Sequence, residues 1–268
     1  MKTEIKNPDQ KFLKKIEKMI DKVIAYIPRK VPTVQVIKEA RIIAHRGAHD
    51  KRFGIEENTY AAFKRALDLG CWGIELDIHA CADKVLVVNH DPDLKRIWKK
   101  NLSIRDSHFQ TLRTHCPNLP TLEEIVQNFG KKIHLFIELK SPFSAFESLK
   151  KVLSSLKPCE DYHLITLDNH ILPYLNDFPK ESLLLVPVHD NVSEYTKISI
   201  EKGYGGVLGH YLLLRDKHVQ ALSAAHQIAG VGFVDSKNNL LRELNRGIKY
   251  LFSNNVEEVT DYVKKFKQ

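Results

Sequence analysis

From residue 41 onward the sequence alternates short apolar runs with stretches of helical periodicity, and this alternation limits the folds open to the chain. The apolar runs are residues 41–44, 73–78 with 85–88 counted as its extension, 133–138, 163–166, 182–186, 206–208, 228–234 and 250–252. Helical periodicity marks residues 59–69, 122–128, 145–156, 169–176, 191–200, 217–229 and 237–246. Strands that alternate with helices form βαβ units around a parallel sheet. About eight such units predict a closed (β/α)8 TIM barrel, with a doubly wound open sheet as the alternative.

A different pattern precedes the first apolar run. Within residues 8–27 apolar side chains recur at helical spacing, and lysines lie mostly on the other faces. This predicts an amphipathic helix that either packs its apolar stripe onto the domain or makes peripheral contact with an anionic membrane surface. Pro28 and Pro32 end the helix and begin a linker. We therefore expect an N-terminal helical extension and linker over residues 1–40, and one barrel domain over residues 41–268.

The composition argues against several classes of protein. Of the 268 residues 43% are hydrophobic and 28% are charged, and no apolar run approaches the roughly 20 residues of a membrane-spanning helix. The N-terminus lacks the apolar core of a secretory signal, so we expect a cytoplasmic protein. The four cysteines include no C-x-x-C pair, which argues against a zinc or redox site. The net charge of +8 favours anionic partners, but the lysines are dispersed, so we expect no nucleic-acid partner.

Polar side chains stand at or near the ends of the first three strands. His45 and Arg46 directly follow the first apolar run. Glu75 and Asp77 lie two residues apart in the second run, so both side chains project from the same face of the strand. Glu138 ends the third run, and the barrel would bring these positions to one rim. Carboxylates held side by side in a core cost several kcal/mol each unless a cation meets them, which favours a metal ion.

Six short motifs follow one another through residues 45–140. They are His45-Arg46-Gly47, Glu57-Asn58-Thr59, Glu75-x-Asp77, His90-Asp91, Pro120-Thr121-Leu122-Glu123-Glu124 and Glu138-Leu139-Lys140. In order and spacing they resemble the glycerophosphodiester phosphodiesterase family. Members of that family are metal-dependent TIM barrels related to the phosphatidylinositol-specific phospholipases C. The resemblance implies the same barrel and a phosphoric diester hydrolase.

The resemblance implies that His45 and His90 are the general acid and base. Cleavage of a phosphodiester takes one proton from an attacking hydroxyl and gives one to the leaving oxygen. An imidazole pKa near 6.5 suits a pair of histidines to both transfers at neutral pH. Asp91 either orients an imidazole or caps the following turn, and we leave both roles open.

Glu75, Asp77 and Glu138 match the metal ligands of the family. Three carboxylates without a histidine or cysteine ligand favour a hard divalent cation, Mg²⁺ or Ca²⁺. We expect Arg46 and Lys140 to bind the substrate phosphate and to neutralise the charge that develops in the transition state. The alternative is a metal-free ion-pair network in which these two cations neutralise the acids.

Two further motif residues precede the helix predicted at residues 59–69. We expect Glu57 to brace the phosphate-binding network or to act electrostatically at the start of the following helix, and Asn58 to cap that helix.

In the C-terminal half the sequence departs from the family: Phe233 stands in place of the tryptophan of a Trp-Thr-Val-Asn motif. A phenylalanine can still stack on substrate but donates no hydrogen bond. We expect this side of the pocket, which would select the alcohol, to differ from the family.

These features predict metal-dependent hydrolysis of glycerophosphodiesters to glycerol 3-phosphate and an alcohol by acid–base catalysis with two histidines. In the family's proposed route the glycerol 2-hydroxyl attacks phosphorus, and water then opens the cyclic phosphate. One alternative is a phospholipase or lysophospholipase of the C or D type that acts on membrane lipids. Another is a catalytically silent barrel that binds a phosphorylated metabolite.

Overall fold

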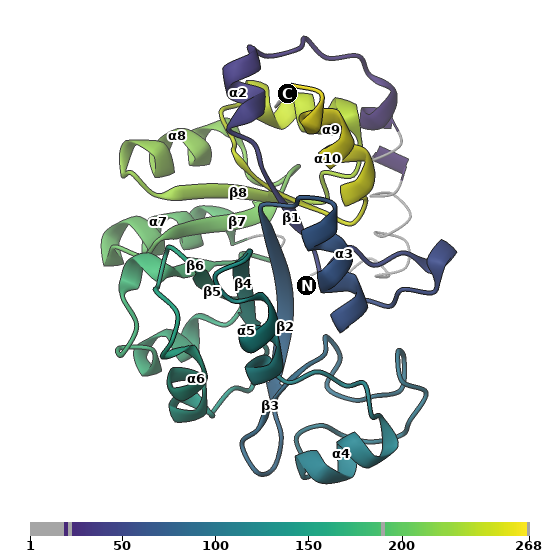
Figure 1. Cartoon of the computed structure of the whole chain (residues 1–268). Coiled ribbons are helices and arrows are strands. Elements are labelled where there is room, and N and C mark those ends of the chain that lie inside the picture. Colours follow the sequence, from purple (N-terminus) through teal and green to yellow (C-terminus); the bar gives the residue numbers. More distant parts are fainter. Residues whose placement is uncertain (1–18, 21–22, 189–190, 267–268) are drawn as a thin grey trace, which may run out of the picture.

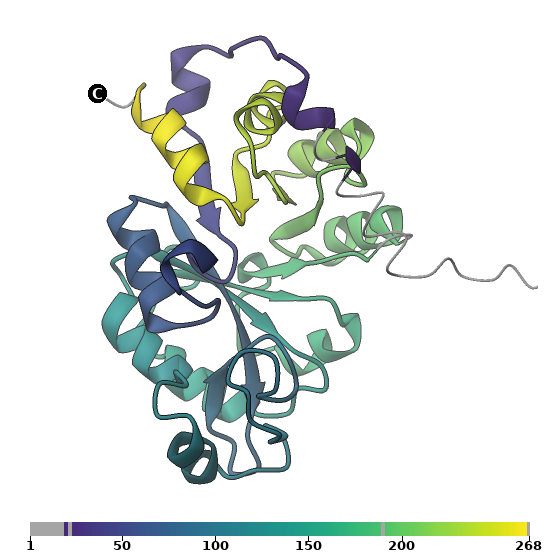
Figure 2. The same ribbon diagram turned by 90° about the vertical axis from the view of Figure 1, so that its right-hand side faces the viewer.

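A computed structural model of the chain describes residues 19–20, 23–188 and 191–266. Within these residues eight parallel strands close into a barrel, which Figure 2 shows surrounded by helices. The strands are β1 (Arg41–Ala44), β2 (Gly73–Ala80), β4 (His134–Leu139), β5 (Tyr162–Thr166), β6 (Leu183–Leu185), β7 (Gly206–His210), β8 (Ile228–Gly232) and β9 (Tyr250–Ser253). Because β1 pairs in parallel with both β2 and β9, the ring of eight parallel strands is closed. The predicted TIM barrel is confirmed, and the open doubly wound sheet is wrong.

Helices follow most strands and cover the outside of the barrel (Figure 1). The α-helices are α2 (Val34–Lys38), α3 (Tyr60–Asp68), α4 (Phe109–His115), α5 (Leu122–Phe129), α6 (Phe146–Leu153), α7 (Val192–Lys202), α8 (Asp216–Ala224), α9 (Lys237–Asn245) and α10 (Val256–Lys264), and the 3₁₀-helices are η1 (Lys51–Phe53), η2 (Asn169–Tyr174) and η3 (Lys180–Ser182). The helix expected at residues 169–176 is η2, a 3₁₀-helix interrupted by Pro173, which has no backbone N–H to donate. Helices α2, α4 and α10 fall outside the predicted stretches.

The apolar run at residues 85–88 does not extend β2. It forms β3 (Leu86–Val88), which folds back antiparallel to β2 and lies beyond the barrel wall (Figure 1). A long excursion between β3 and α5 then buries a small apolar cluster of its own, which includes Leu94 and Leu112. His90 begins this excursion, so it reaches the barrel mouth from outside the ring of parallel strands.

The interior of the barrel is filled. A buried apolar layer consists of Ile43, Phe136, Ile165, Leu184, Leu208 and Phe252. At the N-terminal ends of the strands Trp72 stacks on His134 at 4.5 Å between ring centroids, and the guanidinium of Arg41 lies 4.6 Å above the Trp72 ring. Because this end is closed by aromatic side chains, the polar groups at the C-terminal ends of the strands form the open end of the barrel.

The described part of the N-terminal extension is partly helical. Residues 19–20 and 23–26 are in helical conformation, and most of the helix expected at residues 8–27 lies outside the described residues. Ile24 is buried, whereas Tyr26 is 84% exposed. No helix in the described part of the chain is long and apolar enough to cross a membrane. Membrane contact through this segment and a domain boundary at residue 40 both stay predictions.

Candidate active site

The turn after β1 places His45 and Arg46 at the mouth of the barrel. The backbone N–H of His45 donates to the carbonyl of Ser253 on β9, so His45 continues the barrel wall. The chain then reverses through Arg46 and Gly47, which have φ values of 56° and 79°. A Cβ atom on Gly47 would lie 2.8 Å from the Cβ of Ala62, so the glycine lets α3 pack directly against the turn.

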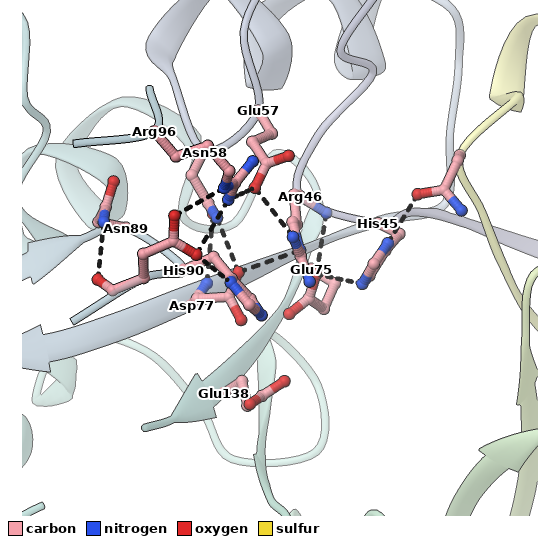
Figure 3. A network of polar contacts seen from close by, with 12 residues as sticks. His45, Arg46, Glu57, Asn58, Glu75, Asp77, Asn89, His90, Arg96 and Glu138 are labelled. Atoms are coloured by element: carbon pink, nitrogen blue, oxygen red, sulfur yellow. Dashed lines mark hydrogen bonds and ion pairs between the residues drawn. The ribbon is translucent and has the colours of Figure 1, made fainter. Parts of the chain in front are cut away.

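Glu75, Asp77 and Glu138 lie together on two neighbouring strands (Figure 3). Asp77 and Glu138 are register partners across β2 and β4, and Glu75 shares the face of Asp77 two residues earlier. One oxygen from each of the three carboxylates lies within 4.8 Å of the others. The Oε1 atom of Glu75 is buried and has no hydrogen-bond partner among the described residues. Carboxylate oxygens in this arrangement fit a hard divalent cation, which would satisfy the orphaned oxygen.

Burial and mutual repulsion set the protonation of these carboxylates. Burial, together with the charges of Asp77 and Glu138, raises the pKa of Glu75 well above its ordinary value. Burial and the charge of Asp77 also raise the pKa of Glu138. For Asp77 burial acts in the same direction, but Lys140 and Arg46 prevail and lower its pKa to about 2. Three acids therefore face two cations, and a bound divalent cation would relieve the remaining repulsion.

Arg46 and Lys140 both contact the carboxylate of Asp77. The Nζ atom of Lys140 lies 2.8 Å from Oδ1 of Asp77 and also pairs with Glu138. The Nε atom of Arg46 lies 3.4 Å from Oδ2 of Asp77, and its backbone N–H donates to Oε2 of Glu75 over 2.8 Å. The two cations predicted to bind phosphate are thus adjacent to the predicted metal ligands.

Asn58 is not the N-cap of α3, and that prediction is wrong. The cap is Thr59, whose side chain accepts a hydrogen bond from the backbone N–H of Ala62. Asn58 is buried one residue earlier, where its Nδ2 donates to Oδ2 of Asp77 over 2.7 Å and its Oδ1 accepts from the backbone N–H of Asp77. The side-chain amide therefore fixes the orientation of a predicted metal ligand.

Glu57 joins two arginines at the edge of the site. Its Oε1 accepts from Nη1 of Arg46 over 2.9 Å and from Nη2 of Arg96 over 2.6 Å. Burial acts to raise the pKa of Glu57, but Arg96 and Arg46 lower it to about 2. The ionised carboxylate consequently holds Arg46 beside Asp77. Arg96 was not predicted, because it lies in the irregular excursion after β3, where the sequence has no periodic signal.

A hydrogen-bonded chain fixes the ring of His45. Its Nδ1 lies 2.8 Å from Oδ1 of Asn254. The backbone N–H and the Nδ2 of Asn254 in turn donate to the carboxylate of Asp235. Because an amide oxygen accepts, Nδ1 carries the proton and Nε2 has the lone pair. Nε2 lies 3.8 Å from Oε2 of Glu75. Burial is the main cause that lowers the pKa of His45 to about 4, so the imidazole is neutral at neutral pH.

His90 reaches the carboxylates from a different direction. Figure 3 shows His90 beside Asp77, and His45 beyond Glu75. The Nδ1 of His90 lies 2.8 Å from Oδ1 of Asp91, an oxygen that also accepts from Arg96, so Asp91 orients the imidazole. Burial is the main cause that lowers the pKa of His90, and the charge of Asp77 and the hydrogen bond to Asp91 act against this shift.

The mouth of the barrel has an aromatic wall and an adjoining cavity. Phe233 follows β8, is 44% exposed, and has its ring centroid 5.9 Å from that of His45. A cavity of about 460 Å³ extends from Glu138 and Lys140 towards Asp168. This cavity leaves space beside Glu138 and Lys140, and the contact of Phe233 with substrate stays a prediction.

Comparison with known proteins agrees with this geometry. Residues 45–182, slightly more than half of the chain, match the model of the glycerophosphoryl diester phosphodiesterase family. The chain belongs to this family. The matched segment starts at His45 and contains the three carboxylates, His90 and Lys140. The family resemblance predicted from the sequence motifs is confirmed.

Curated relatives of the chain are longer than the segments that align. A glycerophosphodiester phosphodiesterase of Caldanaerobacter subterraneus is 33% identical over 134 residues, which cover 46% of this chain and 53% of that protein. A human protein named lysophospholipase D GDPD1 is 35% identical over 105 residues, which cover 39% of this chain and 32% of that protein. The chain thus spans about half the length of the first relative and about a third of the second.

Solved structures share the fold over almost their whole length. A glycerophosphodiester phosphodiesterase from Thermotoga maritima has a TM-score of 0.69 at 23% identity, covering 84% of this chain and 98% of that one. An Oleispira antarctica phosphodiesterase, solved in complex with the product sn-glycerol-3-phosphate, has a TM-score of 0.71 at 19% identity, covering 84% and 96%. At these identities the likeness supports the barrel fold.

Proposed function

We propose that the protein hydrolyses glycerophosphodiesters to glycerol 3-phosphate and an alcohol in a metal-dependent reaction. The observation that carries this proposal is the set of three carboxylate oxygens within 4.8 Å of one another, flanked by two oriented imidazoles. Membership of the glycerophosphoryl diester phosphodiesterase family supports the substrate class. Arg46 and Lys140 supply positive charge where a phosphate next to the carboxylates would lie.

Glu75, Asp77 and Glu138 would hold the divalent cation. Once bound, such a cation polarises the phosphoryl oxygens and stabilises the negative charge that develops on them. Oxygen ligands suit both Mg²⁺ and Ca²⁺, and the preference between them is left to experiment. Arg46 and Lys140 would add to this stabilisation through charge-assisted hydrogen bonds to the phosphate.

His45 and His90 would divide the proton transfers. Each has Nδ1 occupied by an acceptor oxygen, so each keeps Nε2 for the reaction. The low pKa of His45 leaves Nε2 unprotonated, which suits it to accept the proton of an attacking hydroxyl. His90, held by Asp91, would enter the reaction as the imidazolium, which Asp77 and Asp91 stabilise, and would give its Nε2 proton to the leaving alcohol. If the glycerol 2-hydroxyl attacks first, water opens the cyclic phosphate with the two imidazoles in exchanged roles.

The metal dependence is tested by chelation and addition of cations. Purified protein is treated exhaustively with chelator and assayed on glycerophosphocholine before and after Mg²⁺ or Ca²⁺ is restored. We expect hydrolysis to disappear and return with the cation. The variant Glu75→Gln, which keeps the shape of the side chain, should fold normally and stay inactive at excess cation. Full activity in the chelator would contradict the metal site and favour the metal-free ion-pair network.

A lysophospholipid is the second candidate substrate. The human relative is named a lysophospholipase D, and three exposed apolar residues follow barrel strands at their C-terminal ends: Leu167 after β5, Val188 after β6 and Phe233 after β8. Such side chains could meet an acyl chain. A higher kcat/KM for lysophosphatidylcholine than for glycerophosphocholine would favour this candidate, and turnover of neither compound would favour a barrel that only binds ligands.

Location and membrane contact are separate predictions. A cytoplasmic protein whose N-terminal helix packs on the barrel should not float with anionic liposomes. Flotation that is lost when residues 1–30 are removed would show that the extension contacts the membrane.

A further inference from the structure

A basic cavity of about 680 Å³ lies between α8, α9 and the N-terminal extension. Its lining includes five cationic side chains and one acid: Arg29, Arg215, Lys217, Arg242, Arg246 and Asp216. None of the residues assigned to the catalytic site lines it. The cavity is therefore a second concave site with its own charge.

Two of the five cations are neutralised within the protein. The buried carboxylate of Glu243 pairs with Arg242 and with Arg246, whose Nη1 lies 2.6 Å from Oε2 of Glu243. Arg246 also pairs with Asp216, Nε to Oδ1, at 2.6 Å. Two acids thus balance the two arginines at the C-terminal end of α9.

The other three cations have no such partners. Arg29, Arg215 and Lys217 form no ion pair within the described part of the chain, so the cavity carries an excess of three positive charges. Like charges that converge without a counter-charge repel one another, and an anion in the cavity would remove this repulsion.

Arg29 gives an independent indication of a ligand. Its Nε atom is buried and has no hydrogen-bond partner among the described residues. A buried donor left unsatisfied is destabilising, because it has lost its hydrogen bonds to water. The adjacent backbone is fixed, because Nδ2 of Asn245 on α9 donates to the carbonyl of Lys30 over 2.8 Å. Arg29 is consequently held at the cavity with an unsatisfied N–H group in its guanidinium.

The start of α8 adds to the positive potential. Arg215 is the N-cap residue and Lys217 lies in the first turn. The N-terminus of a helix already carries a partial positive charge, so acids are the stabilising residues there and cations are unfavourable. The single acid of this turn, Asp216, is engaged by Arg246. A bound anion would interact favourably with both the helix terminus and the two cations.

We propose that this cavity binds a phosphate dianion, supplied by free phosphate, by a soluble phosphomonoester or by the phosphomonoester head group of a lipid. Guanidinium groups match phosphate oxygens with paired N–H donors, and lysine adds a point charge. Arg29 belongs to the N-terminal extension, whereas Arg215 and Lys217 belong to the barrel. The bound anion therefore fastens the extension to the barrel.

Calorimetric titration with inorganic phosphate tests the site. Chelator is present, because without a cation the three carboxylates of the catalytic site repel phosphate. We expect saturable binding to the wild type and a loss of affinity of about tenfold or more in the double variant Arg215→Gln, Lys217→Gln. The matched control Lys197→Gln, Lys202→Gln makes the same change of charge on α7 and should bind phosphate like the wild type.

Thermal unfolding shows whether each variant is folded, so the binding result does not depend on the proposed hydrolysis. Equal losses in the two double variants would mean that net charge alone attracts phosphate, and would overturn the site. Absence of saturable binding to the wild type, both to free phosphate and to vesicles, would also overturn it.

Vesicle sedimentation separates the sources of the phosphate group. Phosphatidylcholine vesicles with and without phosphatidic acid are compared for the wild type and both double variants. Sedimentation that requires phosphatidic acid, Arg215 and Lys217 supports a lipid head group at the site. Binding of free phosphate without vesicle binding supports a soluble ligand at the same site.

Discussion

The side-chain amide of Asn58 donates a hydrogen bond to Oδ2 of Asp77 over 2.7 Å, from a backbone position with a φ of 55°. The same amide accepts from the backbone N–H of Asp77 through its Oδ1. One residue in the turn before α3 therefore fixes both the backbone and the side chain of a predicted metal ligand on β2. The other oxygen of Asp77 lies 2.8 Å from Lys140, so without Asn58 the carboxylate would be oriented only by ion pairs with Lys140 and Arg46.

Replacing Asn58 should weaken cation binding. We expect Asn58→Gly and Asn58→Ala each to reduce the affinity for Mg²⁺ or Ca²⁺ by about 10–100-fold, because the ligand loses its orienting partner. The two variants should differ in stability, since glycine adopts this φ without strain and alanine incurs about 1 kcal/mol. Calorimetric cation titration measures the affinity, and chemical unfolding measures the difference in stability. Wild-type affinity in the glycine variant would show that the amide does not orient Asp77.

Loss of either imidazole should lower turnover. We expect His45→Ala and His90→Ala each to reduce kcat by about 10²–10⁴-fold, the usual contribution of a general acid or base. His115→Ala, at an exposed histidine of α4, is the matched control and should turn over like the wild type. Initial rates at saturating glycerophosphodiester give the comparison. Wild-type turnover in either active-site variant would rule out the mechanism with two histidines.

Arg96 should act through its partners. It connects Glu57, which holds Arg46, with Asp91, which orients His90. We expect Arg96→Ala to lower kcat/KM by about tenfold, less than the removal of His90. Arg96→Lys should restore little, because an ammonium group cannot reproduce the planar, multiply hydrogen-bonded geometry of a guanidinium. Full recovery by lysine would show that charge alone is needed at this position, and the exposed Arg105→Ala serves as control.

A histidine pair at the closed end of the barrel should make stability depend on pH. His163 donates from Nδ1 to Nε2 of His134 over 2.7 Å, and His134 donates from Nδ1 to the carbonyl of Glu160 over 2.9 Å, so both rings are neutral in the fold. Burial is the largest cause that lowers the pKa of His134 to about 4 and that of His163 to about 3.

Because these pKa values lie below the value of about 6.5 in the unfolded chain, the unfolded state takes up protons first as the pH falls. The two neutral rings therefore contribute their full stabilisation above about pH 6.5. As the pH falls towards 4 and then 3, the free energy of unfolding decreases by roughly 1.4 kcal/mol per pH unit for each ring. Urea unfolding at pH 7, 6 and 5 measures this slope. His163→Phe should reduce the slope, and an unchanged slope would mean that the pair does not titrate on unfolding.

Most of the barrel could be predicted because buried parallel strands are short continuous apolar runs. The assignment of residues 85–88 to β2 was wrong for a local reason. The hairpin before β3 turns through Lys84 at a φ of 64°, a conformation that glycine or asparagine ordinarily signals. A lysine at this position gives no sign that the chain reverses.

The residues proposed to react or to bind the metal, at the ends of β1, β2 and β4, could be placed together from the sequence because barrel topology brings strand ends together. Their supporting residues could not. Asn254 and Arg96 lie in irregular segments far along the chain from His45 and Glu57, and no local pattern connects them. Asn58 was assigned to the helix cap because asparagine suits both caps and left-handed turns, and only its position before Thr59 decides between them.

Identification of the products tests the proposed reaction most directly. Purified protein is incubated with glycerophosphocholine and Mg²⁺ or Ca²⁺, and the phosphorus-containing products are resolved by ³¹P NMR while choline is assayed enzymatically. We expect glycerol 3-phosphate and choline in equal amounts, and neither product in chelator or from Glu75→Gln. Release of phosphocholine and glycerol, or no turnover of any glycerophosphodiester with either cation, would contradict the proposed function.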